Sequence, residues 1–146
     1  MYLNCHSTFS LRYGAIKPEE LPEMAAQLGI KTLCLTDINN TSAHFDFVRA
    51  CIKHNITPLL GIEFRAKDYE PLYTGIARNN QGIFELNSFL SRYSISGQPL
   101  PHRAPAATMP NCYIVYRYDH HHIDPYDIQE NEFIGIRWFE QARLYS

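Results

Sequence analysis

Apolar and polar positions in the first part of the chain follow strand-like and helix-like patterns in turn. Residues 2–5 form a short, half-apolar stretch typical of a strand. A helix is predicted from Pro18 to about Leu28, with Gly29 as a left-handed cap. Four apolar residues share one predicted buried face: Leu21, Met24, Ala25 and Leu28. Residues 30–36 are apolar on both faces, as a parallel strand between helix layers should be.

The same alternation continues to residue 64. A second helix is predicted from Thr41 or Ser42, both good N-caps, to about His54. Its buried face is expected to hold Phe45, Val48 and Ile52. A third strand follows over residues 57–64. The order strand, helix, strand, helix, strand requires a parallel sheet with right-handed crossovers.

The pattern is less regular after residue 65. A fourth strand is predicted over 72–77, and Asn79 or Asn80 then caps a helix with four apolar residues on its buried face: Ile83, Leu86, Phe89 and Leu90. Four prolines in residues 94–111 predict a long loop. Beyond it we expect strands over 112–118 and 133–136 and short helices near 125–129 and 140–144. Residues 1–146 are therefore predicted to form a single domain.

Composition narrows the class of protein. An apolar content of 45% and a charged content of 19% suit a globular domain. A net charge of −2 carries no electrostatic signature of a nucleic-acid binder. The chain has four cysteines without a CxxC pair: Cys5, Cys34, Cys51 and Cys112. The first three lie in apolar strand or helix patterns, so reduced core thiols are expected there. The sequence shows no signal peptide and no apolar run long enough to span a bilayer, so a cytoplasmic location without membrane contact is predicted.

Three successive strands end in side chains that bind metals: His6, Asp37 and Glu63. The carboxyl ends of parallel strands lie on one edge of a sheet, so these side chains can converge. Imidazole and carboxylate together suit zinc, manganese or iron, which activate water for phosphate-ester cleavage. The alternative is structural: Asp37 caps the following loop, and Glu63 pairs with a neighbouring base.

Four segments, residues 3–14, 35–40, 61–64 and 74–82, resemble in order and spacing the amino-terminal PHP (polymerase and histidinol phosphatase) domain of the bacterial DNA polymerase III alpha subunit. The resemblance covers residues 2–93; a Pro-rich loop (94–111) and C-terminal strands and short helices (112–146) follow. It implies an α/β fold: an abridged, distorted (β/α) barrel with a largely parallel sheet and metals at its strand ends. A complete barrel takes about 200 residues or more, so the chain is expected to be an amino-terminal piece of a larger polymerase.

Several of the metal ligands that the family carries are replaced in this sequence. The family opens with His-x-His, but here Asn4 stands in the first position. Tyr13 replaces the acid before the loop glycine, and Ile38 replaces the histidine after Thr-Asp. Asparagine is a poor ligand for these metals, and isoleucine is none. The resemblance therefore predicts a degenerate metal site.

The residual site predicted on this basis has five members, hydrogen-bonded among themselves: Asn4, His6, Asp37, Asn39 and Glu63. If a metal binds, His6 and Glu63 are its expected ligands, with Asp37 and His44 as further candidates. His44 is otherwise an exposed helix residue. No tightly bound cofactor is expected, and zinc or manganese would be the choice if there is one. His120, His121 and His122 are interpreted as a solvated loop.

The function implied by the resemblance is a structural PHP domain that braces a DNA-directed DNA polymerase involved in DNA replication. Its expected partners are the remaining polymerase domains and replisome subunits, with DNA contacted only through the parent protein. A homodimer of the isolated domain is a further way to cover its open sheet edges. Two alternatives stay open. One is an active metal-dependent phosphoesterase or 3′–5′ exonuclease with a reduced site. The other is a module that holds phosphate without turnover.

Overall fold

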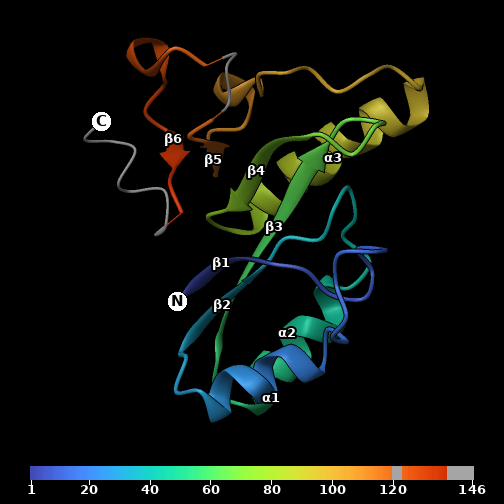
Figure 1. Cartoon of the computed structure of the whole chain (residues 1–146), viewed down its shortest axis with the longest axis vertical. Helices are drawn as coiled ribbons and strands as arrows, with labels where there is room; N and C mark the ends of the chain where they lie inside the picture. Colours follow the sequence, from blue (N-terminus) through green and yellow to red (C-terminus); the bar gives the residue numbers. More distant parts are fainter. Residues whose placement is uncertain (120–122, 138–146) are drawn as a thin grey trace.

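The computed structural model describes residues 1–119 and 123–137, which form a curled sheet with helices packed on its outer side (Figure 1). Its strands are β1 (Tyr2–Cys5), β2 (Thr32–Leu35), β3 (Thr57–Arg65), β4 (Pro71–Ala77), β5 (Cys112–Arg117) and β6 (Glu132–Gly135). The helices are α1 (Glu20–Gln27), α2 (His44–Lys53) and α3 (Asn80–Ser96), with 3-10 turns at Ala106–Thr108 and Pro125–Asp127. The predicted histidine loop at 120–122 and helix at 140–144 lie outside the described residues.

The sheet is mixed, so the prediction of a largely parallel sheet is wrong. The strands lie in sequence order, and the β1–β2, β2–β3 and β5–β6 pairs are parallel. The β3–β4 and β4–β5 pairs are antiparallel. The reason is the short connection between Arg65 and Pro71, because a parallel crossover needs a dozen or more residues. The α/β class holds, and the curled sheet forms only part of a barrel.

One long strand, β3, belongs to both halves of the molecule. Its first residues, Thr57 to Leu60, pair with β2, and the residues from Gly61 onward pair with β4. A β-carbon on Gly61 would lie 2.3 Å from the Gly75 carbonyl oxygen, so only glycine fits where the pairing changes. Figure 1 shows β1, β2, α1 and α2 at one end of β3, and β4, β5, β6 and α3 at the other.

Each half has its own hydrophobic core. The first lies around α1 and α2 and includes Ala25, Leu33, Leu35, Phe47, Cys51 and Ile56. The second lies around α3 and includes Ile62, Phe64, Leu86, Phe89, Ile114 and Tyr116. The predicted buried residues of α3 are confirmed for Leu86 and Phe89, and Asn79 caps this helix by accepting a hydrogen bond from the Gly82 amide.

The predicted buried faces of the first two helices are largely wrong. Leu28, Phe45 and Ile52 are about 70% exposed, at 73%, 73% and 69%. Ala25 is buried as predicted, and the other buried residues are Pro22 in α1 and Phe47, Ala50 and Cys51 in α2. Both helices have apolar residues on more than one side, so spacing alone did not determine which side meets the sheet.

A buried carboxylate holds the C-terminal segments together. Glu132 on β6 accepts hydrogen bonds from Tyr116 Oη (2.6 Å), Arg103 Nη2 (2.7 Å) and the Gln129 amide (2.8 Å). Arg103 also donates to Asp127. This network fixes the Pro-rich loop and β6 against β5 and so positions the groove described below.

The structure also bears on the predictions for the cysteine thiols and for membrane contact. All four cysteines are free. The predicted core position is confirmed for Cys34 and Cys51, whereas Cys5 is only partly buried; Cys112 is buried as well. Burial raises the pKa of the Cys34 and Cys51 thiols to about 12. Within residues 1–119 and 123–137, no helix is long and apolar enough to cross a bilayer.

Candidate functional site

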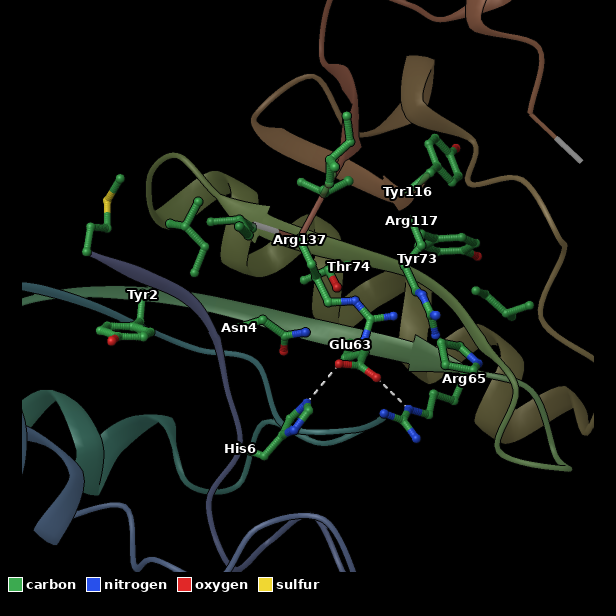
Figure 2. Close-up of a pocket in the computed structure, with 18 residues that line it drawn as sticks. Tyr2, Asn4, His6, Glu63, Arg65, Tyr73, Thr74, Tyr116, Arg117 and Arg137 are labelled. Carbon is green, nitrogen blue, oxygen red and sulfur yellow. Dashed lines mark hydrogen bonds and ion pairs between the residues drawn. The ribbon is translucent and has the colours of Figure 1, made fainter. Parts of the chain in front are cut away.

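The inner face of the curled sheet carries a groove of about 710 Å³ (Figure 2). Met1 to Asn4 line one side of it, and Gly135 to Arg137 line the other. Between them lie the polar side chains of His6, Glu63, Arg65, Thr74 and Arg117. The groove thus brings residues from both ends of the described chain around Glu63.

Glu63 is the centre of the site, and both of its carboxylate oxygens are engaged. His6 Nε2 lies 2.8 Å from Oε2, and Arg65 Nε donates to Oε1 at 2.5 Å. The Glu63 side chain is only 6% exposed, and those of Arg65 and His6 are 10% and 17% exposed. The predicted convergence of His6 and Glu63 is therefore what the structure shows.

The environment of Glu63 favours its charged form. Burial alone would raise the pKa of this carboxyl group, but the hydrogen bonds and positive charges of His6 and Arg65 outweigh burial. The pKa of Glu63 consequently lies below its ordinary value of 4.5.

Arg65 is the base that pairs with Glu63, as the structural alternative predicted, although the sequence analysis did not name it. Asn39 holds its backbone, because Asn39 Oδ1 accepts from the Arg65 amide (3.0 Å) and Nδ2 donates to the Arg65 carbonyl (2.9 Å). The Arg65 guanidinium lies over the Tyr13 ring, 4.1 Å from its centroid. Tyr13, which stands where the family has an acid, thus covers an arginine. The available signal was the Glu-x-Arg spacing, since residues two apart on a strand share a face.

Asp37 does not join this cluster. It is 1% exposed and accepts hydrogen bonds from the Ser7 amide (2.7 Å), Ser7 Oγ (2.6 Å) and Ser10 Oγ (2.6 Å). The predicted hydrogen bonding of Asp37 holds only between backbones, where the Glu63 amide donates to the Asp37 carbonyl oxygen at 3.2 Å. The Asp37 carboxylate does not meet His6 or the Glu63 side chain, because the hydroxyl-rich loop after β1 folds over it and supplies its donors. Asp37 instead fixes the loop that follows His6.

His44 and Asn4 also have other partners. His44 Nε2 lies 3.1 Å from the Gly61 carbonyl oxygen, so His44 is not the exposed helix residue of the alternative interpretation. Burial lowers its pKa, although the contact with Gly61 and the charge of Asp37 partly oppose that shift. Asn4 lines the groove, and its Oδ1 accepts from Thr36 Oγ1 at 2.7 Å.

The residues present do not fit a metal cluster of the kind that the family implies. Of the four candidate ligands, only His6 and Glu63 meet, and Glu63 already accepts from an arginine. In the part of the chain that the structure describes, no group of three or more His, Cys, Asp or Glu side chains is placed to hold a metal ion. A guanidinium provides the positive charge beside Glu63.

The fold and site define a class of domain in which a curled α/β sheet brings a histidine and a glutamate together at its strand ends. The family model described as "PHP domain" matches residues 3–124, and the chain belongs to this family.

Curated relatives lie among DNA polymerase III alpha subunits. The subunit from Buchnera aphidicola subsp. Schizaphis graminum is 31% identical over 97 residues, covering 63% of this chain and 8% of the relative. That from Staphylococcus epidermidis is 33% identical over 89 residues, covering 58% of this chain and 8% of the relative. The chain thus matches under a tenth of the length of these relatives, in the region of their PHP domain.

Two solved structures share the fold. One comes from a Bifidobacterium adolescentis protein inferred to be a metal-dependent phosphoesterase, with a TM-score of 0.50, 20% identity, and coverage of 64% of this chain and 33% of that one. The other is an amidohydrolase from Chromobacterium violaceum with bound sulfate and no metal, with a TM-score of 0.50, 23% identity, and coverage of 65% and 33%.

Proposed function

We propose that this chain is a structural, catalytically silent PHP domain of a DNA polymerase III alpha type of protein, in which Arg65 has taken over the electrostatic role of a metal. The observation that carries this proposal is the pairing of Glu63 with Arg65 Nε at 2.5 Å, beside His6 at 2.8 Å. A carboxylate held by a guanidinium and an imidazole is neutralised without any ion, and it is a poor metal ligand in that state.

The same pairing accounts for the missing ligands. Where a metal cluster is no longer needed, the positions of its other ligands are free to change, and here Tyr13 packs on Arg65 while Ile38 pairs with the Glu63 backbone. Asp37 keeps a structural task in the loop beside the site. Tyr13, Ile38 and Asp37 thus each have a structural role in this protein.

The expected setting of the domain is the replication machinery. Relatives that contain this region are about twelve times longer than the matched segment, since that segment covers 8% of their length. We propose that the remaining polymerase domains and replisome subunits are the partners, that DNA is contacted through them, and that the protein is cytoplasmic. A homodimer of the isolated domain stays a prediction, to be checked by sedimentation.

Metal content and metal affinity test the proposal directly. Purified, tag-free protein is analysed for bound metal and then titrated with zinc and manganese by calorimetry. We expect no stoichiometric metal and no binding tighter than about 1 mM, which corresponds to about −4 kcal/mol. Hydrolysis of bis(p-nitrophenyl) phosphate should not exceed that of a Glu63→Ala variant.

A matched control separates this site from the histidine-rich segment at 120–122. Replacing His120, His121 and His122 by alanine removes a histidine-rich sequence of a kind known to bind metals, and any weak adventitious binding should disappear with it. Tight binding at one or more equivalents that survives this change but is lost in Glu63→Ala would contradict the proposal. It would favour the alternative of an active phosphoesterase or exonuclease with a reduced site.

A further inference from the structure

The groove runs along the edge of a strand rather than over the face of one. Four consecutive residues, Met1 to Asn4, line it, whereas a strand that turned only one face to a groove would contribute every second residue. Among the described residues, β1 pairs with β2 alone. The backbone of β1 therefore borders the groove with hydrogen-bonding groups that the sheet does not use.

The opposite wall of the groove is likewise lined by consecutive residues of the chain. Three consecutive residues from the end of β6 and just beyond it, Gly135 to Arg137, line the groove there. The floor between the walls is the inner face of β3, β4 and β5, including Thr74, Ile76 and Val115. The groove thus lies between two strand ends, and its shape and its backbone groups match an extended polypeptide.

The charge of the groove is opposite to that of the whole chain. Its lining contains three arginines, Arg65, Arg117 and Arg137, and one carboxylate, Glu63, which gives a formal charge of +2 before any charge on His6 is counted. The net charge of the chain is −2. Figure 2 shows Arg117 and Arg137 reaching toward Glu63 from the side opposite His6. This concentration of positive charge favours an anionic occupant.

Arg117 is able to exchange its present contact for one with a partner. Its Nη2 lies 2.9 Å from Asp119 Oδ2, but the two side chains are 44% and 47% exposed, so water weakens this pair. Because Arg117 lines the groove, a carboxylate bound there can accept from the same guanidinium, which is able to form bidentate pairs.

We propose that the groove binds an extended acidic segment of a partner protein, which adds as a strand along β1 and pairs its carboxylates with Arg117 and Arg137. The edge of β1 supplies the backbone pairing, the arginines select acidic side chains, and Ile76 and Val115 accept an apolar one. A small anion would fill only the arginine end. A nucleic-acid strand lacks the regularly spaced amides that a strand edge requires.

The test uses the full chain and a fluorescent peptide of about ten residues, the upper end of strand length, in which glutamate alternates with threonine and valine. Anisotropy should show saturable binding. Two altered peptides, one with lysine in place of glutamate and one N-methylated at alternate amides, should each bind at least about tenfold more weakly, the factor that 1.4 kcal/mol represents. Backbone amides of β1 should gain protection from hydrogen exchange in the complex.

Protein variants identify the site. The double variant Arg117→Gln/Arg137→Gln should lose at least about tenfold in affinity for the acidic peptide, as expected for charged hydrogen bonds. Arg92→Gln, on the exposed side of α3, removes one positive charge elsewhere and should leave affinity unchanged. Circular dichroism checks that all variants are folded.

Three outcomes would overturn the proposal. Equal binding of the lysine peptide would show that charge does not select the ligand, and an N-methylated peptide that binds as well would exclude strand addition. Tighter binding of oligothymidylate or inorganic phosphate, lost in the double arginine variant, would assign the groove to a phosphate ligand instead.

Discussion

Replacing Arg65 by glutamine gives the sharpest test of the site, because it removes the charge that neutralises Glu63 while keeping a long polar side chain. Glu63 and Arg65 are 6% and 10% exposed, so neither charge is well solvated. At 2.5 Å and an effective dielectric constant of about 20, their Coulomb attraction is about 7 kcal/mol, most of which offsets the cost of desolvation. The net loss is therefore far smaller than the attraction.

Breaking a buried pair by removing one partner costs about 3–5 kcal/mol. We expect Arg65→Gln to lower the free energy of unfolding by about 3 kcal/mol, the lower end of this range, because His6 still contacts one oxygen of Glu63. Urea unfolding at pH 7, followed by far-UV circular dichroism, measures the loss, and an unchanged m-value shows that it is a change in stability.

The matched variants are Glu63→Gln and the double variant. If the two side chains interact as described, the double variant should lose about 1–3 kcal/mol less than the sum of the two single losses. The pH gives a second check. The pKa of Glu63 is lowered, so its contribution is complete above the ordinary value of 4.5 and disappears as the pH falls through the lower native value. Additive losses, or a loss below about 0.5 kcal/mol for Arg65→Gln, would refute the central role of this pair.

Other parts of the fold give further predictions. Tyr73→Phe removes a buried hydroxyl group that has no hydrogen-bond partner among the described residues, so the melting temperature should stay the same or rise; a loss above about 1 kcal/mol would contradict this. Asp37→Ala removes the acceptor of three hydrogen bonds and should cost about 2–4 kcal/mol and speed proteolysis of the 7–10 loop, whereas unchanged cleavage would argue against that anchor. The pKa of His44 is lowered in the folded protein, so the unfolded chain takes up the proton first and the free energy of unfolding should fall as the pH drops below the ordinary value of 6.5. Urea titrations of His44→Gln should show a smaller fall. An identical pH profile would exclude His44 as a source of this pH dependence. Cys34, with its pKa raised to about 12, should react with a thiol reagent at pH 8 only after urea is added, and rapid labelling of the native protein would disprove its burial.

The sequence predicted the meeting of His6 and Glu63 because a parallel β1–β2–β3 unit places strand ends at one edge whatever follows. It did not predict the partner of Asp37. Ser7 and Ser10 lie in an irregular loop, and the direction of their hydroxyl groups depends on how that loop folds back. Placing a side chain at a strand end is therefore easier than identifying its hydrogen-bond donors.

Two of the errors could have been avoided from the sequence, and one could not. The turn after Arg65 is too short for a crossover, so the antiparallel β3–β4 pair was predictable from its length. The buried side of α2 could not be predicted from the sequence. Phe45 and Phe47 lie on different sides of this helix, and only packing against the sheet decides which of them is covered. Arg65 itself was not predicted, because a basic residue is not a metal ligand. Its position two residues after Glu63 nevertheless places both side chains on one face of the strand.

The division of β3 between two cores has a consequence for how the protein opens and refolds. We expect each core to unfold as one cooperative unit, and the strand from Thr57 to Arg65 contributes to both. Native-state hydrogen exchange should therefore detect two partial openings, one that exposes the amides of β1 and β2 and one that exposes those of β5 and β6, while the middle of β3 exchanges only through global unfolding. Gly61 lies at the point of division, where a β-carbon would clash with the Gly75 carbonyl oxygen, so a substitution there should disturb both units.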